Sequence, residues 1–224
     1  MGNLYLVGTP IGNLQDITFR ALETLKEVDL ILAEDTRRAG VLLKHFEIKK
    51  PLSSFHEHNE LRREDEIIGI LKSGQNVALI SDAGTPTLSD PGFKLVRRCY
   101  EEKINVFSIP GASAILAALA ASGLPTDSFA FLGYFPKKKG KQDKFLEKIS
   151  ILVRDLKITV VFFETPHRIL TTLEILDASF PERELALARE LTKVNEEKLK
   201  GKVPEVFEQV KGRSLKGEMT LVLR

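Results

Sequence analysis

Short apolar runs that lead directly into turns of small and polar residues recur in the first half of the chain. Leu4 to Val7 precedes Gly8-Thr-Pro-Ile-Gly-Asn13, and Val77 to Ile80 precedes Ser81-Asp-Ala-Gly-Thr-Pro86. Ile104 to Ile109 repeats the arrangement ahead of Pro110-Gly-Ala-Ser-Ala114. Each run is typical of a buried parallel strand whose carboxyl end opens into a loop, the place where open α/β sheets bind ligands. We therefore expect these loops to share one pocket for an extended small molecule.

Strands and helices are predicted to alternate through the first half. The apolar pattern places strands near 3–8, 29–33, 76–81 and 104–109, and helices near 17–27, 36–46, 59–73, 92–103 and 112–122. Such repetition favours a mainly parallel sheet with helices on its faces. Asp16 or Thr18 is expected to cap the first helix, Asp35 or Thr36 the second, and Asp90 to begin the fourth.

The second half has a different spacing. Strands are predicted near 129–134, 158–164, 185–189 and 219–223, and helices near 142–153, 166–178 and 204–211. The short separations allow antiparallel neighbours, which indicates a mixed sheet. Gly123-Leu-Pro125 ends the last helix of the first half and is typical of a junction. The sequence thus predicts an α/β protein with domains at 1–122 and 123–224.

Composition narrows the functional class. The 224 residues are 43% hydrophobic and 29% charged, and 33 Lys and Arg nearly balance 31 Asp and Glu, so any nucleic-acid contact must come from local patches. Cys99 is the single cysteine, which excludes an internal disulfide and a metal site made only of cysteines. We expect it to be an inert, packed thiol. The start of the chain lacks a signal-peptide pattern, and no apolar stretch is long enough to cross a membrane, so we expect a cytoplasmic protein without a membrane partner.

The loops carry candidate ligand contacts. The first has neither a GxGxxG fingerprint nor a Walker motif, which disfavours NAD and nucleoside triphosphates; Pro10 fixes its turn. In the second, Ser81, Asp82, Gly84 and Thr85 offer hydroxyls, a carboxylate and close backbone approach, although an Asx-turn that closes the loop on itself explains the same residues. Ser113 either caps the following helix or presents its hydroxyl to a ligand.

Charged clusters supply candidate chemistry. Glu34 and Asp35 could bind or deprotonate a hydroxyl, while Arg37 and Arg38 steer an anionic substrate; a capped helix start with local ion pairs is the alternative. His56 and His58 lack a third ligand, so no metal is expected and a polar substrate contact is favoured. The basic run is interpreted as a surface loop or a phosphate contact, with Tyr134 and Phe135 able to stack on a base. Its members are Lys137, Lys138, Lys139, Lys141 and Lys144.

Several segments together resemble one family in order as well as content. They are Gly8-Thr-Pro-Ile-Gly-Asn-Leu14, Ala33-Glu-Asp-Thr-Arg37, Phe55-His-Glu-His-Asn59, Ser81-Asp-Ala-Gly-Thr-Pro86, Asp90-Pro-Gly92, Pro110-Gly111, Gly123-Leu-Pro125, Ala188-Arg-Glu-Leu-Thr-Lys193 and Gly217-Glu-Met219. The set resembles the bacterial small-subunit ribosomal RNA 2′-O-ribose methyltransferases of the tetrapyrrole methylase superfamily. The likeness spans nearly the whole chain. Gly8 and Ala112 depart mildly from that pattern, and many members carry a further C-terminal segment beyond the position of Arg224.

The resemblance implies a two-domain tetrapyrrole-methylase-like fold that holds S-adenosylmethionine in a cleft between the domains, and a homodimer. The implied substrate is the ribose 2′-hydroxyl of a cytidine at the decoding centre of the small ribosomal subunit. The implied donor contacts are Pro10, Asp82, Gly84, Thr85, Ser113, Ala114, Phe163, Leu187 or Ala188, and Met219 or Thr220.

Methyl transfer to a hydroxyl calls for a base and for groups that hold phosphates. Glu34, Asp35, His56 and Glu190 are candidate bases by type, with Asp35 or Glu34 preferred. Arg37, Arg38, Lys193 and the basic run are candidates to hold RNA. The alternatives are a methylase of a corrin or porphyrin ring with the same donor site, a non-catalytic RNA-binding factor with a vestigial pocket, and a Rossmann-type nucleotide enzyme, which the missing fingerprint disfavours.

Overall fold

The computed structural model describes all 224 residues, which form two compact units: unit 1, Met1–Ser113, and unit 2, Ala114–Arg224. The division falls before helix α5 (Ala114–Ala121), whereas the sequence placed a junction after it. Helix α5 contacts strands β7 (Thr159–Glu164) and β10 (Met219–Leu223), both of unit 2. Each unit contains one five-stranded sheet.

Unit 1 is built on a sheet in the order β3-β2-β4-β1-β5, in which every neighbouring pair is parallel. The parallel first sheet expected from the sequence is confirmed. Three of the strands border the loops of interest: β1 (Leu4–Val7), β4 (Val77–Ile80) and β5 (Val106–Ile109). The other two are β2 (Leu30–Ala33) and β3 (Leu52–Ser54). β3 was not predicted because its Leu-Ser-Ser has one apolar residue.

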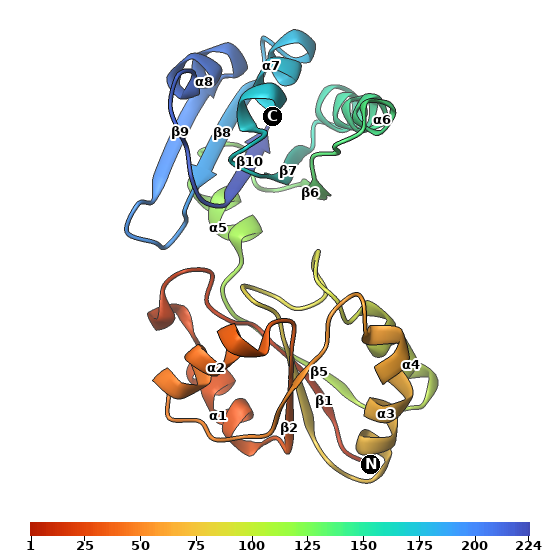
Figure 1. The fold of residues 1–224 in the computed structure, drawn as a ribbon. Helices are drawn as coiled ribbons and strands as arrows, with labels where there is room; N and C mark the ends of the chain where they lie inside the picture. The colour runs from red at the N-terminus through yellow and green to blue at the C-terminus, as the bar shows by residue number, and fades with distance from the viewer. The chain divides into compact units, whose positions relative to one another are not determined.

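Helices cover both faces of this sheet (Figure 1). On strand β4, Ala78 and Ile80 pack into the apolar cluster that includes α1 and α2, while Val77 and Leu79 pack into the cluster that includes α3 and α4. This burial on both faces explains why β4 is an uninterrupted apolar run. The helices of unit 1 are α1 (Phe19–Glu27), α2 (Thr36–His45), α3 (Glu60–Lys72) and α4 (Phe93–Glu101), with a short 3-10 turn η1 (Leu14–Asp16).

Caps fix where these helices begin. The side chain of Thr18 accepts a hydrogen bond from Ala21 N at the start of α1, and Asp35 accepts one from Arg37 N at the start of α2. The cap expected for α4 is wrong, because the N-cap is Gly92 with φ +119 rather than Asp90. The Asp90 carboxyl is thus not used to begin the helix.

Unit 2 has the sheet order β6-β7-β10-β8-β9, with β6 and β7 parallel and every other pair antiparallel, so the mixed sheet is confirmed. Its remaining strands are β6 (Phe129–Tyr134), β8 (Glu184–Arg189) and β9 (Glu197–Lys202). β9 was not predicted because Leu199 is its only large apolar residue. The other helical elements are α6 (Lys139–Ser150), the π-helical turn η2 (Ile151–Asp155), α7 (Ile169–Ser179) and α8 (Val203–Val210).

One face of this sheet carries the core of unit 2. Phe162, Leu187, Met219 and Leu221 join residues of α6, α7 and α8 in one apolar cluster. Glu164 lies at the end of β7 with a fully buried side chain, paired with Arg168 at 2.6 Å and hydrogen-bonded by Thr172 Oγ1 at 2.6 Å. None of the helices in the chain combines the length and the apolar character needed to cross a membrane.

Candidate functional site

The loops after β1, β4 and β5 are held together at the carboxyl edge of the sheet in unit 1. Thr9 and Gly84 exchange backbone hydrogen bonds of 2.9 and 3.1 Å, joining the first two loops. Gly8 and Gly111 join the first and third, since a Cβ on Gly8 would lie 2.8 Å from Gly111 N. Only glycine permits such close backbone approach.

Gly84 lies where these loops converge. Its φ of +87 favours glycine, and a Cβ there would meet Ile11 Cγ2 at 3.4 Å and the Ala112 carbonyl oxygen at 3.7 Å. The three loops therefore form a cradle, defined here as the space around Gly84 bordered by Ile11 and Ala112. The predicted contacts Pro10, Thr85 and Ser113 belong to the same loops. Ser81 is buried and its hydroxyl lies 3.5 Å from the Gly84 carbonyl oxygen, so it supports the loop from within.

Asp82 links the loop after β4 to the loop after β2. Its Oδ1 accepts a hydrogen bond from Asp35 N at 3.0 Å, and its Oδ2 pairs with Arg38 at 3.2 Å. The structure thus brings together three residues that the sequence selected separately. Because a carboxylate offers about four acceptor positions, these two contacts leave capacity for a ligand hydroxyl.

Asp35 and Arg37 form a closed pair at the start of α2. Arg37 donates to Asp35 through Nε at 3.0 Å and through NH2 at 2.6 Å. These side-chain hydrogen bonds, reinforced by the Arg37 backbone N–H, hold the pKa of Asp35 well below its usual range. A carboxylate with so low a pKa is a weak proton acceptor.

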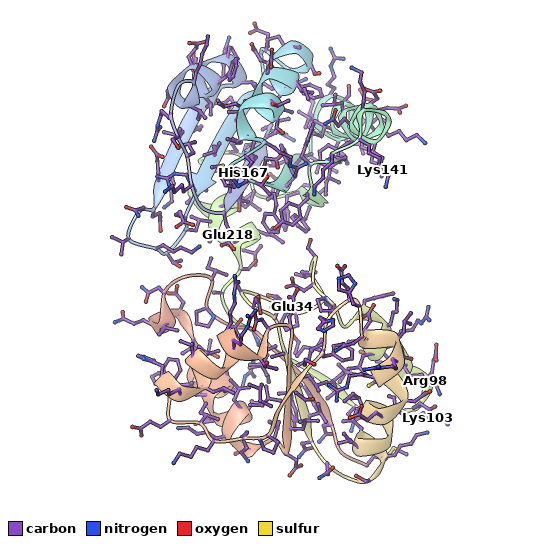
Figure 2. All side chains as sticks on the ribbon, viewed as in Figure 1. Glu34, Arg98, Lys103, Lys141, His167 and Glu218 are labelled. Carbon is purple, nitrogen blue, oxygen red and sulfur yellow. The ribbon has the colours of Figure 1, made fainter.

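Glu34, which is labelled in Figure 2, differs from Asp35 because its pKa is raised rather than lowered. Burial raises its pKa above the ordinary value, and the negative charges of Asp82 and Glu57 raise it further, while Arg38 and His56 oppose the shift. A carboxyl group with a raised pKa binds a proton more readily, so electrostatics favour Glu34 over Asp35 as a base.

Asp90 is a further acidic residue near Glu34 and Asp82. From the sequence it was interpreted mainly as a helix start. Burial raises its pKa to about 6, the charge of Glu34 adds to the shift, and a hydrogen bond from Ser81 opposes it. The loop that carries it contains Thr87 and Ser89 with φ of +74 and +66, an uncommon conformation for residues other than glycine. The only sequence signal was an acid in the same loop as Asp82.

His56, one of the groups that oppose the raised pKa of Glu34, lies in a polar turn. Its Nε2 lies 3.2 Å from Asn59 Nδ2, and its Nδ1 is buried without a hydrogen-bond partner. The chain contains no group of three or more His, Cys, Asp or Glu side chains arranged to hold a metal ion.

In unit 2 the predicted donor contacts fall on opposite faces of the sheet. Thr220 pairs in register with Phe163 on β7 and with Ala188 on β8, so these three lie in one row across adjacent strands. Because side chains alternate along a strand, Leu187 and Met219 point to the other face, where both belong to the apolar core. The sequence left two choices open, Leu187 or Ala188 and Met219 or Thr220. Only Ala188 and Thr220 lie on the same face of the sheet as Phe163. Ala114 is the first residue of α5.

Glu190 and Lys193 form a local charge cluster after β8. Lys193 Nζ lies 2.9 Å from Glu190 Oε1 and 3.0 Å from Glu218 Oε2. The hydrogen bond from Lys193 lowers the pKa of Glu190, which makes it a poor base. The charge of Lys193 is shared between two carboxylates, and this limits what it offers to a phosphate. Glu190 and Thr192 have φ of +51 and +67.

The basic run is helical over most of its length. Helix α6 begins at Lys139, so the expectation of a loop through Lys144 is wrong; Lys137 and Lys138 alone precede the helix. Phe135 is 1% exposed and packs against Phe145 and Phe162, so the expectation that it stacks on a base is also wrong. The lysines are exposed, as Lys141 shows in Figure 2.

A protein-family model described as tetrapyrrole (corrin/porphyrin) methylases matches residues 3–206. The chain belongs to the tetrapyrrole methylase family. The family expected from the ordered motifs is confirmed.

Relatives of this tetrapyrrole methylase cover it from end to end. A Thermotoga maritima protein named ribosomal RNA small subunit methyltransferase I is 48% identical over 223 residues, covering 100% of this chain and 98% of that protein. A Haemophilus influenzae protein of the same name is 50% identical over 226 residues, covering 99% of this chain and 78% of that protein.

Solved structures confirm the tetrapyrrole methylase fold. A diphthine synthase matches with a TM-score of 0.78 at 16% identity, covering 99% of this chain and 90% of that one. The methyltransferase CobJ matches with a TM-score of 0.71 at 20% identity, covering 100% of this chain and 94% of that one. At such identities the likeness concerns the fold alone.

Proposed function

We propose that this chain is an S-adenosylmethionine-dependent methyltransferase that modifies the ribose 2′-hydroxyl of a cytidine in small-subunit ribosomal RNA. The observation that carries the proposal is a cradle for a small molecule and a carboxyl group of raised pKa, Glu34, at the same edge of one sheet. The relatives named as ribosomal RNA small subunit methyltransferases support the choice of substrate.

The loops of unit 1 have the features that the donor requires. Gly84 leaves the space that any side chain would fill, and the remaining acceptor positions of Asp82 suit ribose hydroxyls. Pro10, Thr85 and Ser113 lie in the loops that border this space. Phe163, Ala188 and Thr220 are the predicted contacts from unit 2. S-adenosylmethionine, when bound, supplies a methyl group on a sulfonium.

The residues of the chain then have two tasks. They would bind the substrate so that its ribose hydroxyl is held next to the methyl group of the donor. Glu34 would accept the proton that the hydroxyl loses when it takes up the methyl group, and would become protonated. Asp35 instead fixes α2 and Arg37.

Exposed basic groups would hold the RNA near this edge. Arg37 and Arg38 have side chains 90% and 69% exposed, so they can reach a phosphate while paired with Asp35 and Asp82. The lysines around the start of α6 are a second candidate contact. We also propose that the protein is a homodimer, as the family resemblance implies; sedimentation analysis of the purified chain that gave only monomer would contradict this.

The decisive experiment uses small ribosomal subunits from a strain that lacks this protein. Purified chain and isotope-labelled S-adenosylmethionine are incubated with these subunits, and the modified nucleotide is mapped by mass spectrometry. We expect one methylated ribose. A parallel reaction with a tetrapyrrole replaces the subunits and tests the competing substrate class.

Three results would contradict the proposal. A methylated base would exclude ribose chemistry, and a methylated tetrapyrrole with unmodified subunits would indicate the competing substrate. Subunit binding without donor binding, measured by calorimetry, would indicate a non-catalytic RNA-binding factor.

A further inference from the structure

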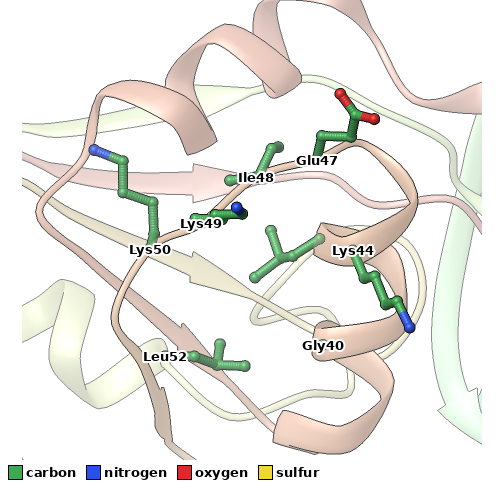
Figure 3. A pocket seen from close by; sticks show the side chains of 8 residues that line it. Gly40, Lys44, Glu47, Ile48, Lys49, Lys50 and Leu52 are labelled. Atoms are coloured by element: carbon green, nitrogen blue, oxygen red, sulfur yellow. The ribbon is translucent and has the colours of Figure 1, made fainter.

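An open groove of about 730 Å³ lies on unit 1 between the end of α2 and strand β3 (Figure 3). We call it the α2–β3 groove. Three lysines and one glutamate are the charged residues that line it, so its net charge is positive. Its lining residues are Gly40, Leu43, Lys44, Glu47, Ile48, Lys49, Lys50 and Leu52.

The backbone that carries these lysines is well anchored. After α2 ends, Glu47 takes a left-handed conformation with φ +56, and Ile48 N donates to the Leu43 carbonyl at 2.8 Å. Leu43 and Ile48 are 4% and 6% exposed and belong to the apolar core. Lys44 and Lys49, each next to one of these buried residues, are exposed. The basic groups therefore project from a fixed turn.

No carboxylate neutralises these ammonium groups. Lys44, Lys49 and Lys50 make no ion pair, whereas Lys193, Lys202 and Lys211 each contact a glutamate within 3 Å. Unpaired lysines gathered around a concave surface are available to a polyanion, and each phosphate that they contact releases a counterion.

Helix α2 connects the groove to the candidate catalytic edge. The helix spans Thr36–His45, about 15 Å at 1.5 Å per residue. Arg37 and Lys44 are seven residues apart, close to two turns, so they lie on the same side of the helix. A small substrate cannot extend from one end of α2 to the other, but a polynucleotide can.

We propose that the α2–β3 groove binds the sugar-phosphate backbone of the RNA substrate, one helix length away from the nucleotide that is modified. This inference rests on the proposed function. RNA is favoured over an acidic protein because the same helix presents arginines at the candidate ribose site, so one continuous anionic chain accounts for both ends.

The test compares two triple variants with the same change in charge. The groove variant combines Lys44→Glu, Lys49→Glu and Lys50→Glu. The matched control combines Lys26→Glu, Lys103→Glu and Lys157→Glu at exposed lysines outside the groove. Affinity for small subunits is measured without donor across a salt series, and donor affinity and melting temperature are measured for each variant.

We expect the groove variant to bind small subunits about tenfold or more weakly at physiological salt, and its slope of log affinity against log salt to fall by about 2–3. The control should stay within about twofold of wild type. A Lys→Arg triple at the groove should bind as wild type does, because charge rather than shape is required. Donor affinity should not change.

Equal losses in the groove and control variants, or an unchanged salt slope in the groove variant, would overturn the inference. So would weakened binding to intact subunits with unchanged binding to deproteinised ribosomal RNA, which would indicate an acidic protein partner. The binding measurement does not depend on catalysis. An absence of methylation would therefore refute the proposed activity, while the binding data would still test whether the groove contacts RNA.

Discussion

Glu34, Asp35 and Asp90 lie in loops after two neighbouring strands of unit 1 and differ in what surrounds each carboxyl group. Arg37 fixes Asp35 as an anion, while burial and like charges raise the pKa of Glu34 and bring that of Asp90 to about 6. The sequence identified Glu34 and Asp35 as acids before an arginine pair. It could not rank them, because the ranking depends on partners up to 48 residues away, such as Asp82.

Replacing Glu34 with Gln should lower kcat by about 100- to 10,000-fold, the usual contribution of a general base. The amide keeps the shape of the carboxyl group but cannot accept the hydroxyl proton. Donor affinity, measured by calorimetry, should stay within about threefold of wild type. A variant with near-normal kcat would remove Glu34 from the mechanism.

Asp82→Asn should move the acidic limb of the pH profile of kcat to lower pH. The base is active when deprotonated, so activity falls as pH falls through the pKa of Glu34. Because the negative charge of Asp82 is one cause of the raised pKa of Glu34, removing that charge lowers the pKa of Glu34. A limb that stays in place, measured over pH 5 to 8, would show that the groups are independent.

At the scale of elements, particular backbone positions decide how the strands and loops meet. Gly92 is the N-cap of α4 with φ +119, and a Cβ there would overlap the side chain of Leu79 on β4. The apolar run of β4 was readable from the sequence because both of its faces are buried. β3 and β9 were not predicted because both are edge strands. Edge strands bury little apolar surface and carry polar residues, so they lack an apolar run.

Gly92→Ala should destabilise unit 1 by about 1–3 kcal/mol, since the new methyl group meets Leu79 in a conformation that favours glycine. Gly69→Ala is the matched control: Gly69 lies within α3 with no atom within 4 Å of an added Cβ. Helix propensity predicts that this control gains about 0.5–1 kcal/mol. Urea unfolding of both variants gives the comparison, and destabilisation of both by the same amount would contradict it.

On β8 and β10, the predicted donor contacts lie on one face of the sheet and the core residues on the other. Thr220→Val keeps nearly the same volume and removes the hydroxyl, so we expect donor affinity to fall about 2- to 10-fold with little change in stability. Leu187→Ala removes a core side chain and should cost about 2–5 kcal/mol of stability, with unchanged donor affinity in the folded protein. The reverse pattern in calorimetry and unfolding would place the donor on the core face.

At the scale of the whole molecule, the family likeness supplied what local patterns could not. Parallel β-α repetition predicted the first sheet, and the ordered motifs predicted the family. The placement of the Leu187, Met219 and Phe135 side chains in the apolar core required the register of the second sheet. The α2–β3 groove could not be predicted from the sequence either, because Lys44, Lys49 and Lys50 do not form a continuous basic run.

If residues of both units contact the donor, S-adenosylmethionine should stabilise both against heat. A ligand at 100 times its dissociation constant adds about 2.7 kcal/mol to the state that binds it. Scanning calorimetry should show every unfolding transition of the chain shifted to higher temperature. A shift confined to one of two resolved transitions would restrict the donor contacts to one unit.

The lone cysteine gives this molecule a practical advantage. Cys99 is fully buried, and burial raises the pKa of its thiol to about 11, so it reacts little with maleimide dyes near neutral pH. Cysteines introduced at Lys26 in unit 1 and Lys157 in unit 2 could therefore carry a fluorophore pair in an otherwise native background. Energy transfer between the dyes would then report, in single molecules, whether the distance between the two dyes changes when the methyl donor or the ribosomal subunit is added.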